Sequence, residues 1–146
     1  MRKYVIYFLL ILIVIVHSSC GPQLTVEGDV TESKLIIDEK RSFLTIYVRV
    51  QNTSNLPSGT LYAKFQILDN SLATALGFET FVFSNNQQIP EPFEIQPNRG
   101  FFIGETFEYN ANLPLEQLER AVQVVIYNNA GENVTEFLIE RVEKEE

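Results

Sequence analysis

Apolar and polar side chains alternate with a period of two through most of this chain, and this alternation restricts the possible folds more than any other feature. In residues 43–51 every second position is apolar, and the same spacing returns in residues 61–67. Successive side chains of a β-strand point to opposite faces, so each segment is expected to bury one face and expose the other. The positions expected to be buried are Leu44, Ile46, Val48, Val50, Leu61, Ala63, Phe65 and Ile67.

Turn signals divide the rest of the chain into further strand candidates. Residues 38–42, which are mostly charged, and residues 128–132, which contain Asn and Gly, each separate two apolar runs and are predicted to be hairpin turns. About eight short strands with a turn every ten residues or so indicate a β-sandwich. We therefore predict an all-β protein, an immunoglobulin-like antiparallel β-sandwich over residues 24–142. Its expected strands are residues 24–30 with a bulge at Gly28, 34–37, 43–50, 61–67, 80–84, 93–95, 101–109, 121–127 and 134–142.

Two segments depart from this alternation. Leu115 and Leu118 are three residues apart behind Pro114, a spacing that predicts a short helical turn within residues 114–120. Residues 71–79 fit neither a strand nor a helix clearly and stay unassigned. The last four residues, 143–146, are expected to form a solvated acidic tail.

Three segments of the chain carry a family resemblance. Val50–Ser54, Phe65–Asp69 and Ile95–Gly100 resemble the small secreted immunoglobulin-like modules called FxLYD domains. Those modules follow an Asn-x-Ser strand end with a Phe-x-Leu-Tyr-Asp-like strand and a later apolar-x-Pro-Gly turn. Here Ile67 and Leu68 replace the Leu and Tyr of that strand. The resemblance covers residues 44–127 and implies an immunoglobulin-like fold that mediates contacts, without catalytic residues.

The first nineteen residues have the layout of a secretion signal. Arg2 and Lys3 precede an uninterrupted apolar stretch of thirteen residues, Tyr4–Val16. As a helix this stretch would be about 20 Å long, at roughly 1.5 Å per residue. The hydrocarbon core of a bilayer, about 30 Å thick, needs roughly twenty such residues. Residues 1–19 are therefore expected to be a signal peptide that is removed after export.

The only cysteine of the chain, Cys20, directly follows this signal. The order of apolar stretch, small and polar residues, Cys20 and Gly21 resembles the bacterial lipoprotein signal, although His17 and Ser19 depart from the apolar and Gly or Ala residues of that pattern. The resemblance implies that Cys20 carries fatty acyl chains such as palmitate and becomes the new N-terminus. The protein would then be anchored to the outer face of the cell membrane, or to the outer membrane of a cell that has two. Residues 20–23 would form a tether of about 10 Å, at roughly 3.3–3.6 Å per residue.

Charge excludes one class of partner. The chain has 11 basic and 19 acidic residues, a formal charge of −8. Loss of residues 1–19, with Arg2 and Lys3, leaves nine basic and nineteen acidic residues, a charge of −10. Such a surface repels phosphate backbones, so nucleic acid is not expected as a partner. It also repels anionic lipid headgroups, so overall charge attraction is not expected to hold the domain at a membrane.

The composition also leaves little catalytic chemistry. The only histidine, His17, lies in the signal, and a lipid on Cys20 would block the only thiol. Catalytic triads and zinc or haem sites built on His or Cys are therefore not expected. Residues 69–71 and 128–133 hold oxygen ligands but match no calcium-loop spacing, and turn propensity explains them better. We expect no enzyme, no metal and no cofactor.

Aromatic residues are dense in the second half of the domain. Most of them are expected to fill the core, because sandwich strands need large inward-facing side chains. Phe101 and Phe102 are adjacent, so their side chains should point to opposite faces of a strand. One of the two is therefore expected to be exposed, and both Phe101 and Phe102 are possible residues for contact with a partner. The aromatic group comprises Phe78, Phe81, Phe83, Phe93, Phe101, Phe102, Phe107 and Tyr109.

The sequence thus predicts a membrane-anchored exported lipoprotein with one immunoglobulin-like domain. Its expected function is that of a binding or scaffolding module that contacts another protein of the cell envelope through a sheet face, loops or an edge strand. Two alternatives stay open. The domain could bind envelope polysaccharide or peptide through its aromatic residues, or it could be a hydrolase that uses carboxylates.

Overall fold

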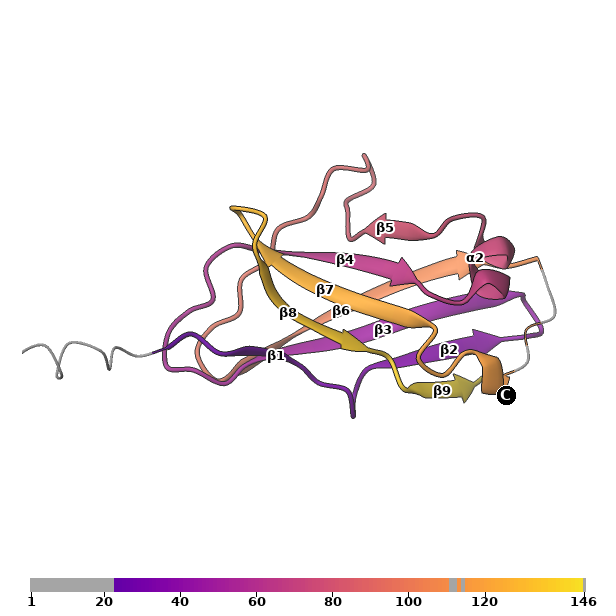
Figure 1. The fold of residues 1–146 in the computed structure, drawn as a ribbon, viewed down its shortest axis with the longest axis horizontal. Helices are drawn as coiled ribbons and strands as arrows, with labels where there is room; N and C mark the ends of the chain where they lie inside the picture. Colours follow the sequence, from indigo (N-terminus) through magenta and orange to yellow (C-terminus); the bar gives the residue numbers. More distant parts are fainter. Residues whose placement is uncertain (1–22, 111–112, 114, 146) are drawn as a thin grey trace, which may run out of the picture.

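The computed structural model describes residues 23–110, 113 and 115–145 and shows an immunoglobulin-like β-sandwich (Figure 1). The predicted signal peptide and Cys20 lie outside the described residues. Within the described ranges, no helix has the length and apolar character needed to cross a bilayer.

The larger sheet is built around one long strand, β3. Along one edge β3 pairs with β1 and β2, and along the other edge it pairs with β6 over its whole length. All of these pairs are antiparallel, whereas β9 joins the outer side of β2 in a parallel pair. The strands are β1 (Val26–Gly28), β2 (Lys34–Asp38), β3 (Phe43–Asn52), β6 (Arg99–Glu108) and β9 (Arg141–Lys144).

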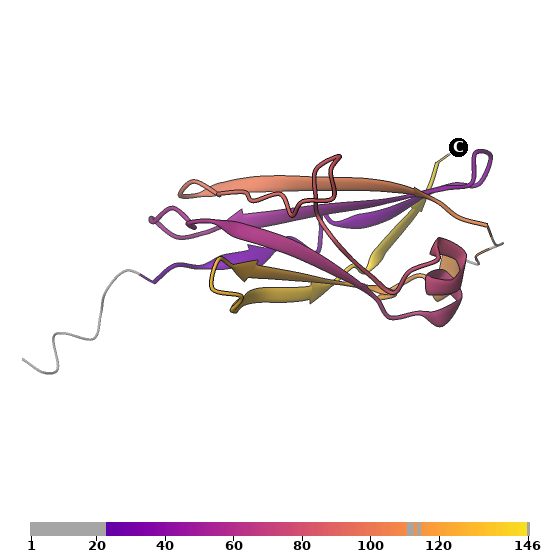
Figure 2. The ribbon, with the colours of Figure 1, turned by 90° about the horizontal axis from the view of Figure 1, so that it is seen from above.

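The smaller sheet is fully antiparallel, in the order β5, β4, β7, β8. When the two sheets are viewed edge-on, they lie face to face as two layers (Figure 2). The strands are β4 (Leu61–Ile67), β5 (Thr80–Val82), β7 (Val122–Asn128) and β8 (Asn133–Leu138).

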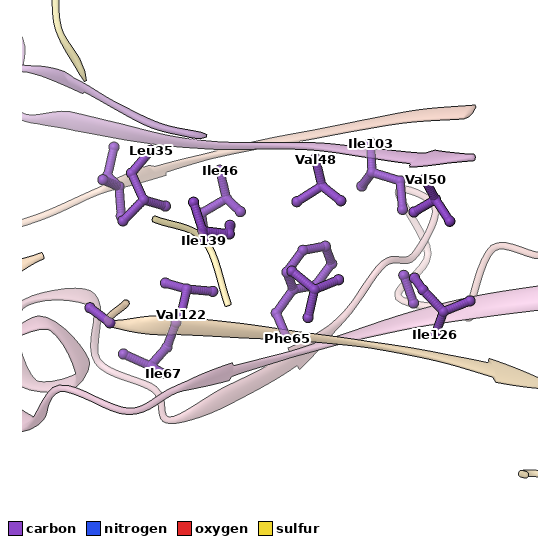
Figure 3. Packing of buried hydrophobic residues seen from close by; sticks show 14 of the residues in the cluster. Leu35, Ile46, Val48, Val50, Phe65, Ile67, Ile103, Val122, Ile126 and Ile139 are labelled. Atoms are coloured by element: carbon purple, nitrogen blue, oxygen red, sulfur yellow. The ribbon is translucent and has the colours of Figure 1, made fainter. Parts of the chain in front are cut away.

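The core fills the space between the two layers (Figure 3). Every second residue of β3 and of β4 is buried, as the alternation predicts. The central side chains come from both sheets, and Ile139 packs among them from the link between β8 and β9. The labelled core residues are Leu35, Ile46, Val48, Val50, Ile103, Phe65, Ile67, Val122, Ile126 and Ile139.

Both predicted hairpins are confirmed, because residues 38–42 join β2 to β3 and residues 128–132 join β7 to β8. The predicted helical turn is a short 3-10 helix, η1 (Leu115–Gln117).

The unassigned segment 71–79 overlaps the one α-helix of the described residues, α2 (Asn70–Leu76). The Asp69 side chain caps its N-terminus by accepting a hydrogen bond from the Leu72 backbone N–H at 2.8 Å. Gly77 ends it in the left-handed conformation with a φ of 82°. An N-cap Asp and a C-terminal Gly eight residues later are helix boundary signals. Among the oxygen ligands of residues 69–71, the side-chain oxygen of Asp69 therefore serves as the cap of this helix.

Three strand predictions are wrong in detail. The single strand expected over residues 134–142 is two strands, because the chain leaves the smaller sheet after β8 and enters the larger one as β9. Since β9 extends to Lys144, the first two residues of the expected acidic tail, 143–146, are paired with β2. The expected strand 93–95 is reduced to one bridge between Leu61 and Phe93. Gly28 is not a bulge, since β1 pairs with β3 in regular register. A glycine is needed at this position because there is no room for a side chain: a Cβ would lie 2.0 Å from the Phe137 ring.

Candidate functional site

The two adjacent phenylalanines in β6 have different environments. Phe101 is half-buried and stacks on Phe93, with ring centroids 4.4 Å apart and an angle of 6° between the planes. It therefore belongs to the packing beside the core. Phe102 points the other way and is 52% exposed on the outer face of the larger sheet. Of the two predicted contact residues, Phe102 is the one whose ring is available to a partner.

The Phe102 ring is held in place by two side chains of β3. Tyr47 stacks against it with a centroid distance of 5.7 Å and an interplanar angle of 28°. The Arg49 guanidinium carbon lies 5.4 Å from the ring centroid, close enough for a cation–π interaction. Arg49 is directly opposite Phe102 in the β3–β6 register. We call Tyr47, Arg49 and Phe102 the Phe102 patch.

Arg49 is itself fixed by a set of polar contacts on the same face. Its Nη1 donates to Oδ2 of Asp29 at 3.0 Å, and Nε2 of Gln51 donates to the same oxygen at 2.8 Å. The backbone N–H of Arg49 donates to Oγ of Ser33 at 3.0 Å. The guanidinium is therefore oriented by an ion pair that is largely shielded from water, since the Asp29 side chain is only 11% exposed.

Two glycines of β6 leave space around the patch. Gly100 lies opposite Gln51, and a Cβ at Gly100 would be 3.0 Å from Nε of Arg49. Gly104 lies opposite Tyr47. Beside the patch is a hollow of about 220 Å³, lined by Arg49, Gln51, Asn52, Thr53, Asn98, Arg99 and Gly100. Nε of Arg49 is buried and has no hydrogen-bond acceptor among the described residues.

The Phe102 patch and the hollow beside it hold side chains that could bind a ligand. An aromatic face, a guanidinium and the amide of Gln51 can stack on a flat group and form hydrogen bonds with it. Within the described ranges, no group of three His, Cys, Asp or Glu residues is placed to hold a metal ion.

The carboxyl group of Glu105 has a raised pKa. Burial raises the pKa of Glu105 in β6, and the negative charge of Glu91 raises that pKa further. A raised carboxyl pKa is one requirement of a general acid. Glu105 is therefore the residue on which the carboxylate-hydrolase alternative depends.

A second aromatic pair lies on the smaller sheet, and the sequence reasoning missed it. Tyr62 of β4 and Tyr127 of β7 are opposite each other in register and stack with centroids 5.5 Å apart. Burial raises the pKa of Tyr127, and neighbouring Tyr62 adds to this shift. The signal was available, because Tyr62 alternates with the apolar residues of residues 61–67 and so had to face outward.

Most of the other aromatic side chains pack beside the core, as expected. Phe78, Phe81 and Phe107 meet edge to face, with centroids 4.8–5.6 Å apart. Phe81 also stacks on the buried Phe65 at 4.4 Å. Phe78 follows α2, Phe81 is in β5 and Phe107 is in β6, so these rings join the smaller sheet to the larger one.

The predicted turn residues at 128–133 are explained by local hydrogen bonds. Oδ1 of Asn128 accepts from the backbone N–H groups of Ala130 and Glu132, at 2.9 and 3.0 Å. Nδ2 of Asn128 donates to the Glu132 carboxylate at 2.8 Å. These oxygens therefore serve the hairpin turn.

Comparison with known proteins gives distant structural likenesses. No protein-family model matches the chain, and no curated protein matches it significantly. The ligand binding region of Serine-glutamate repeat protein A of Enterococcus faecium is 7% identical at a TM-score of 0.42, over 85% of this chain and 98% of that one. A CARDB domain from Pyrococcus furiosus, solved in complex with di-metal ions, is 10% identical at a TM-score of 0.41, over 84% of this chain and 94% of that one.

A third solved structure is much larger than this chain. The alkylpurine DNA glycosylase of Pseudomonas fluorescens is 10% identical at a TM-score of 0.39, over 88% of this chain. The chain spans only 33% of the length of that enzyme. These likenesses are too distant to assign a function to this chain.

Proposed function

We propose that this protein is an exported lipoprotein, anchored through Cys20, whose sandwich is a non-catalytic binding module at the cell envelope. The anchor follows from the basic pair at Arg2 and Lys3, the apolar stretch Tyr4–Val16 and the position of Cys20. In the sequence, three residues, Gly21–Gln23, separate Cys20 from Leu24. The acylated end and the folded domain are therefore directly joined.

The observation that carries the binding function is the fixed orientation of the exposed Phe102 ring. Scattered exposed apolar residues are normal on protein surfaces. Phe102 differs from them because Tyr47 and Arg49 hold its ring in place, and Arg49 is held in turn by Asp29. The Phe102 side chain therefore loses little conformational entropy when a partner covers it. Complete burial of a phenylalanine side chain contributes about 1.5–3 kcal/mol, and the exposed half of this ring supplies part of that. The favoured partner is another protein of the envelope.

Site-specific crosslinking in cells tests this proposal. A photo-crosslinking amino acid replaces Phe102, and the control replaces Leu68, which is 53% exposed on a different part of the surface. We expect one dominant crosslinked protein from position 102 and none from position 68. Equal, diffuse crosslinking from both positions would contradict a binding role for the Phe102 patch.

The stacked Tyr47–Phe102 pair also supports the alternative of envelope polysaccharide binding, since sugars stack on aromatic faces. In that case the protein would be retained on cell-wall material and Phe102→Ser would release it, while crosslinking to protein would stay weak. A peptide bound at the same patch would be released by the same substitution.

The hydrolase alternative rests on Glu105 and Glu91. We propose that the domain has no such activity. A turnover on glycans or esters that Glu105→Gln abolishes without lowering the unfolding temperature would overturn this part of the proposal.

A further inference from the structure

Three segments far apart in the sequence meet at one end of the sandwich. These are residues 23–25, 53–59 and 96–99, which lie together at the left of Figure 1, where the described chain begins. Thr53 N–H donates to the Thr25 carbonyl at 3.0 Å, and Asn98 N–H donates to the Ser54 carbonyl at 3.3 Å. We call this surface the anchor end, because Cys20 precedes it directly.

The anchor end contains no acidic residue and a single charged one, Arg99. Arg99 is exposed and has no ion-pair partner in the described part of the chain. The nearest acidic residues along the chain, Glu27 and Glu94, lie two residues outside these segments.

The segments at the opposite end of the sandwich carry a net negative charge. The turn 38–42, the segment 68–79 around α2 and the segment 108–121 around η1 hold seven acidic and three basic residues. These residues are Asp38, Glu39, Asp69, Glu79, Glu108, Glu116 and Glu119, against Lys40, Arg41 and Arg120.

Two leucines are partly exposed at the anchor end. Leu24 is 41% exposed and Leu56 is 37% exposed. Leu56 is on a fixed loop, because its carbonyl accepts from Nδ2 of Asn52 at 2.6 Å and from Oγ of Ser54 at 3.0 Å. The same Asn52 amide donates to the Ile95 carbonyl, so the loop 53–59 is bound to the segment before β6.

We propose that the anchor end rests on the surface of the bilayer that holds the lipid of Cys20. Leu24 and Leu56 would then enter the boundary between headgroups and acyl chains, and Arg99 would lie among the lipid phosphates. The occupant follows from where the described chain begins, from the leucines and from the charge of Arg99. This inference rests on the proposed lipid anchor.

The net charge of the domain does not oppose this orientation. β3 runs from the acidic end to the anchor end over ten residues, roughly 33 Å at about 3.3 Å per residue. This separation is several times the Debye length of about 8 Å at physiological ionic strength. Repulsion between the acidic end and anionic lipids is therefore screened.

The contact itself is small and depends on the tether. Two leucines and one arginine would bind a membrane only weakly if the domain were free in solution. A four-residue tether keeps the anchor end close to the bilayer and so raises its effective concentration there. The contact would fix the orientation of a domain that is already anchored, with its long sheets standing away from the membrane and the Phe102 patch on a side face.

Lipid-borne quenching of a fluorophore tests this orientation. The native lipidated full-length protein is reconstituted into vesicles of equal parts phosphatidylethanolamine and phosphatidylglycerol, some of the lipid carrying a quencher near the headgroup. With Cys20 acylated, Leu56→Cys or Leu68→Cys supplies the only free thiol for a polar fluorophore. We expect several-fold stronger lipid quenching at position 56 than at position 68, and the reverse order with a water-soluble quencher.

Substitution of the contact residues provides the second measurement. A polar fluorophore at Thr53→Cys reports on the same loop, and Leu24→Ser, Leu56→Ser and Arg99→Glu are combined with it. We expect the lipid quenching at position 53 to fall to the level seen at position 68. Unchanged quenching at position 53 would overturn the roles given to these three residues.

The failures of the two proposals can be told apart. If the protein does not float with the vesicles, the lipid anchor is wrong. If it floats but positions 56 and 68 are quenched equally, the anchor stands and the proposed orientation is wrong.

Discussion

Asn52 determines the shape of the anchor end through four hydrogen bonds. Its Nδ2 donates to the carbonyls of Leu56 and Ile95, and its Oδ1 accepts from the N–H and the hydroxyl of Ser54. Asn52 itself is only 1% exposed. Because Ser54 and Ile95 are buried, loss of the amide would leave their polar groups without this partner and without full access to water.

Asn52→Ala is therefore expected to destabilise the domain by about 1–3 kcal/mol, the cost of leaving buried polar groups unsatisfied. Urea unfolding of the variant and of a Thr53→Ala control measures this difference. Thr53 is adjacent and exposed, so the control should change stability little. Equal stability of the two variants would contradict the role given to Asn52.

Glu105 gives a residue-scale prediction with a pH dependence. Burial and Glu91 raise its pKa above the ordinary value of 4.5, so its charged form is disfavoured in the folded state. The folded state therefore binds this proton more tightly than the unfolded state does, and the charged carboxylate lowers stability at neutral pH. Glu105→Gln is expected to stabilise the domain at neutral pH.

This gain should shrink as the pH falls through the raised pKa towards 4.5, because the native carboxyl group is then neutral as well. Thermal unfolding across this pH range measures the effect, with Glu108→Gln on the same strand as the exposed control. A gain that is independent of pH, or equal for both variants, would show that Glu105 has no raised pKa.

At the scale of elements, alternation was sufficient where a strand has one buried and one exposed face. β3 and β4 follow their apolar positions residue by residue. The period does not reveal a change of sheet, which is why the segment that holds β8 and β9 was predicted as one strand. Seven-residue α2 is too short to show a helical period, and only its boundary residues Asp69 and Gly77 indicate it.

Contacts between elements could not be predicted from the sequence either. Gly28 was predicted as a bulge, yet its lack of a side chain serves the approach of β1 to Phe137 in β8. The pairing of Tyr47 and Arg49 with Phe102 depends on the β3–β6 register, which residue patterns do not fix. For this reason the sequence could name Phe101 and Phe102 but could not choose between them.

Gly28→Ala tests the close approach of β1 and β8. The new Cβ would lie 2.0–2.4 Å from the Phe137 ring, so the strands or the ring must move. Overpacking of this kind costs about 1–3 kcal/mol. The free energy of unfolding from urea titration measures the loss.

Gly104→Ala is the matched control for this substitution. It lies in β6 with its nearest neighbour, Cδ2 of Tyr47, 4.0 Å away, so the added methyl has room. We expect Gly104→Ala to be neutral or to stabilise by about 0.4–1 kcal/mol, because it restricts the unfolded chain. A loss of the same size at both glycines would contradict the steric account.

At the scale of the whole molecule, the sandwich has two unlike ends and one distinctive face. One end follows Cys20, and the three segments that form the anchor end hold Arg99 as their one charged residue, whereas the segments at the other end hold seven acidic and three basic residues. The Phe102 patch lies on the outer face of the larger sheet, between these ends. An anchored module built in this way would present its aromatic ring to neighbours in the envelope beside it.

The mass of the mature protein isolated from cell membranes tests the central claim most directly. We predict a polypeptide that starts at Cys20 and is heavier than the bare chain by about two or three acyl chains, since one chain alone gives only marginal anchoring. Cys20→Ala should move the protein to the soluble fraction. A mass that shows Cys20 unmodified, or residues 1–19 still attached, would contradict the lipid anchor and the membrane orientation that depends on it.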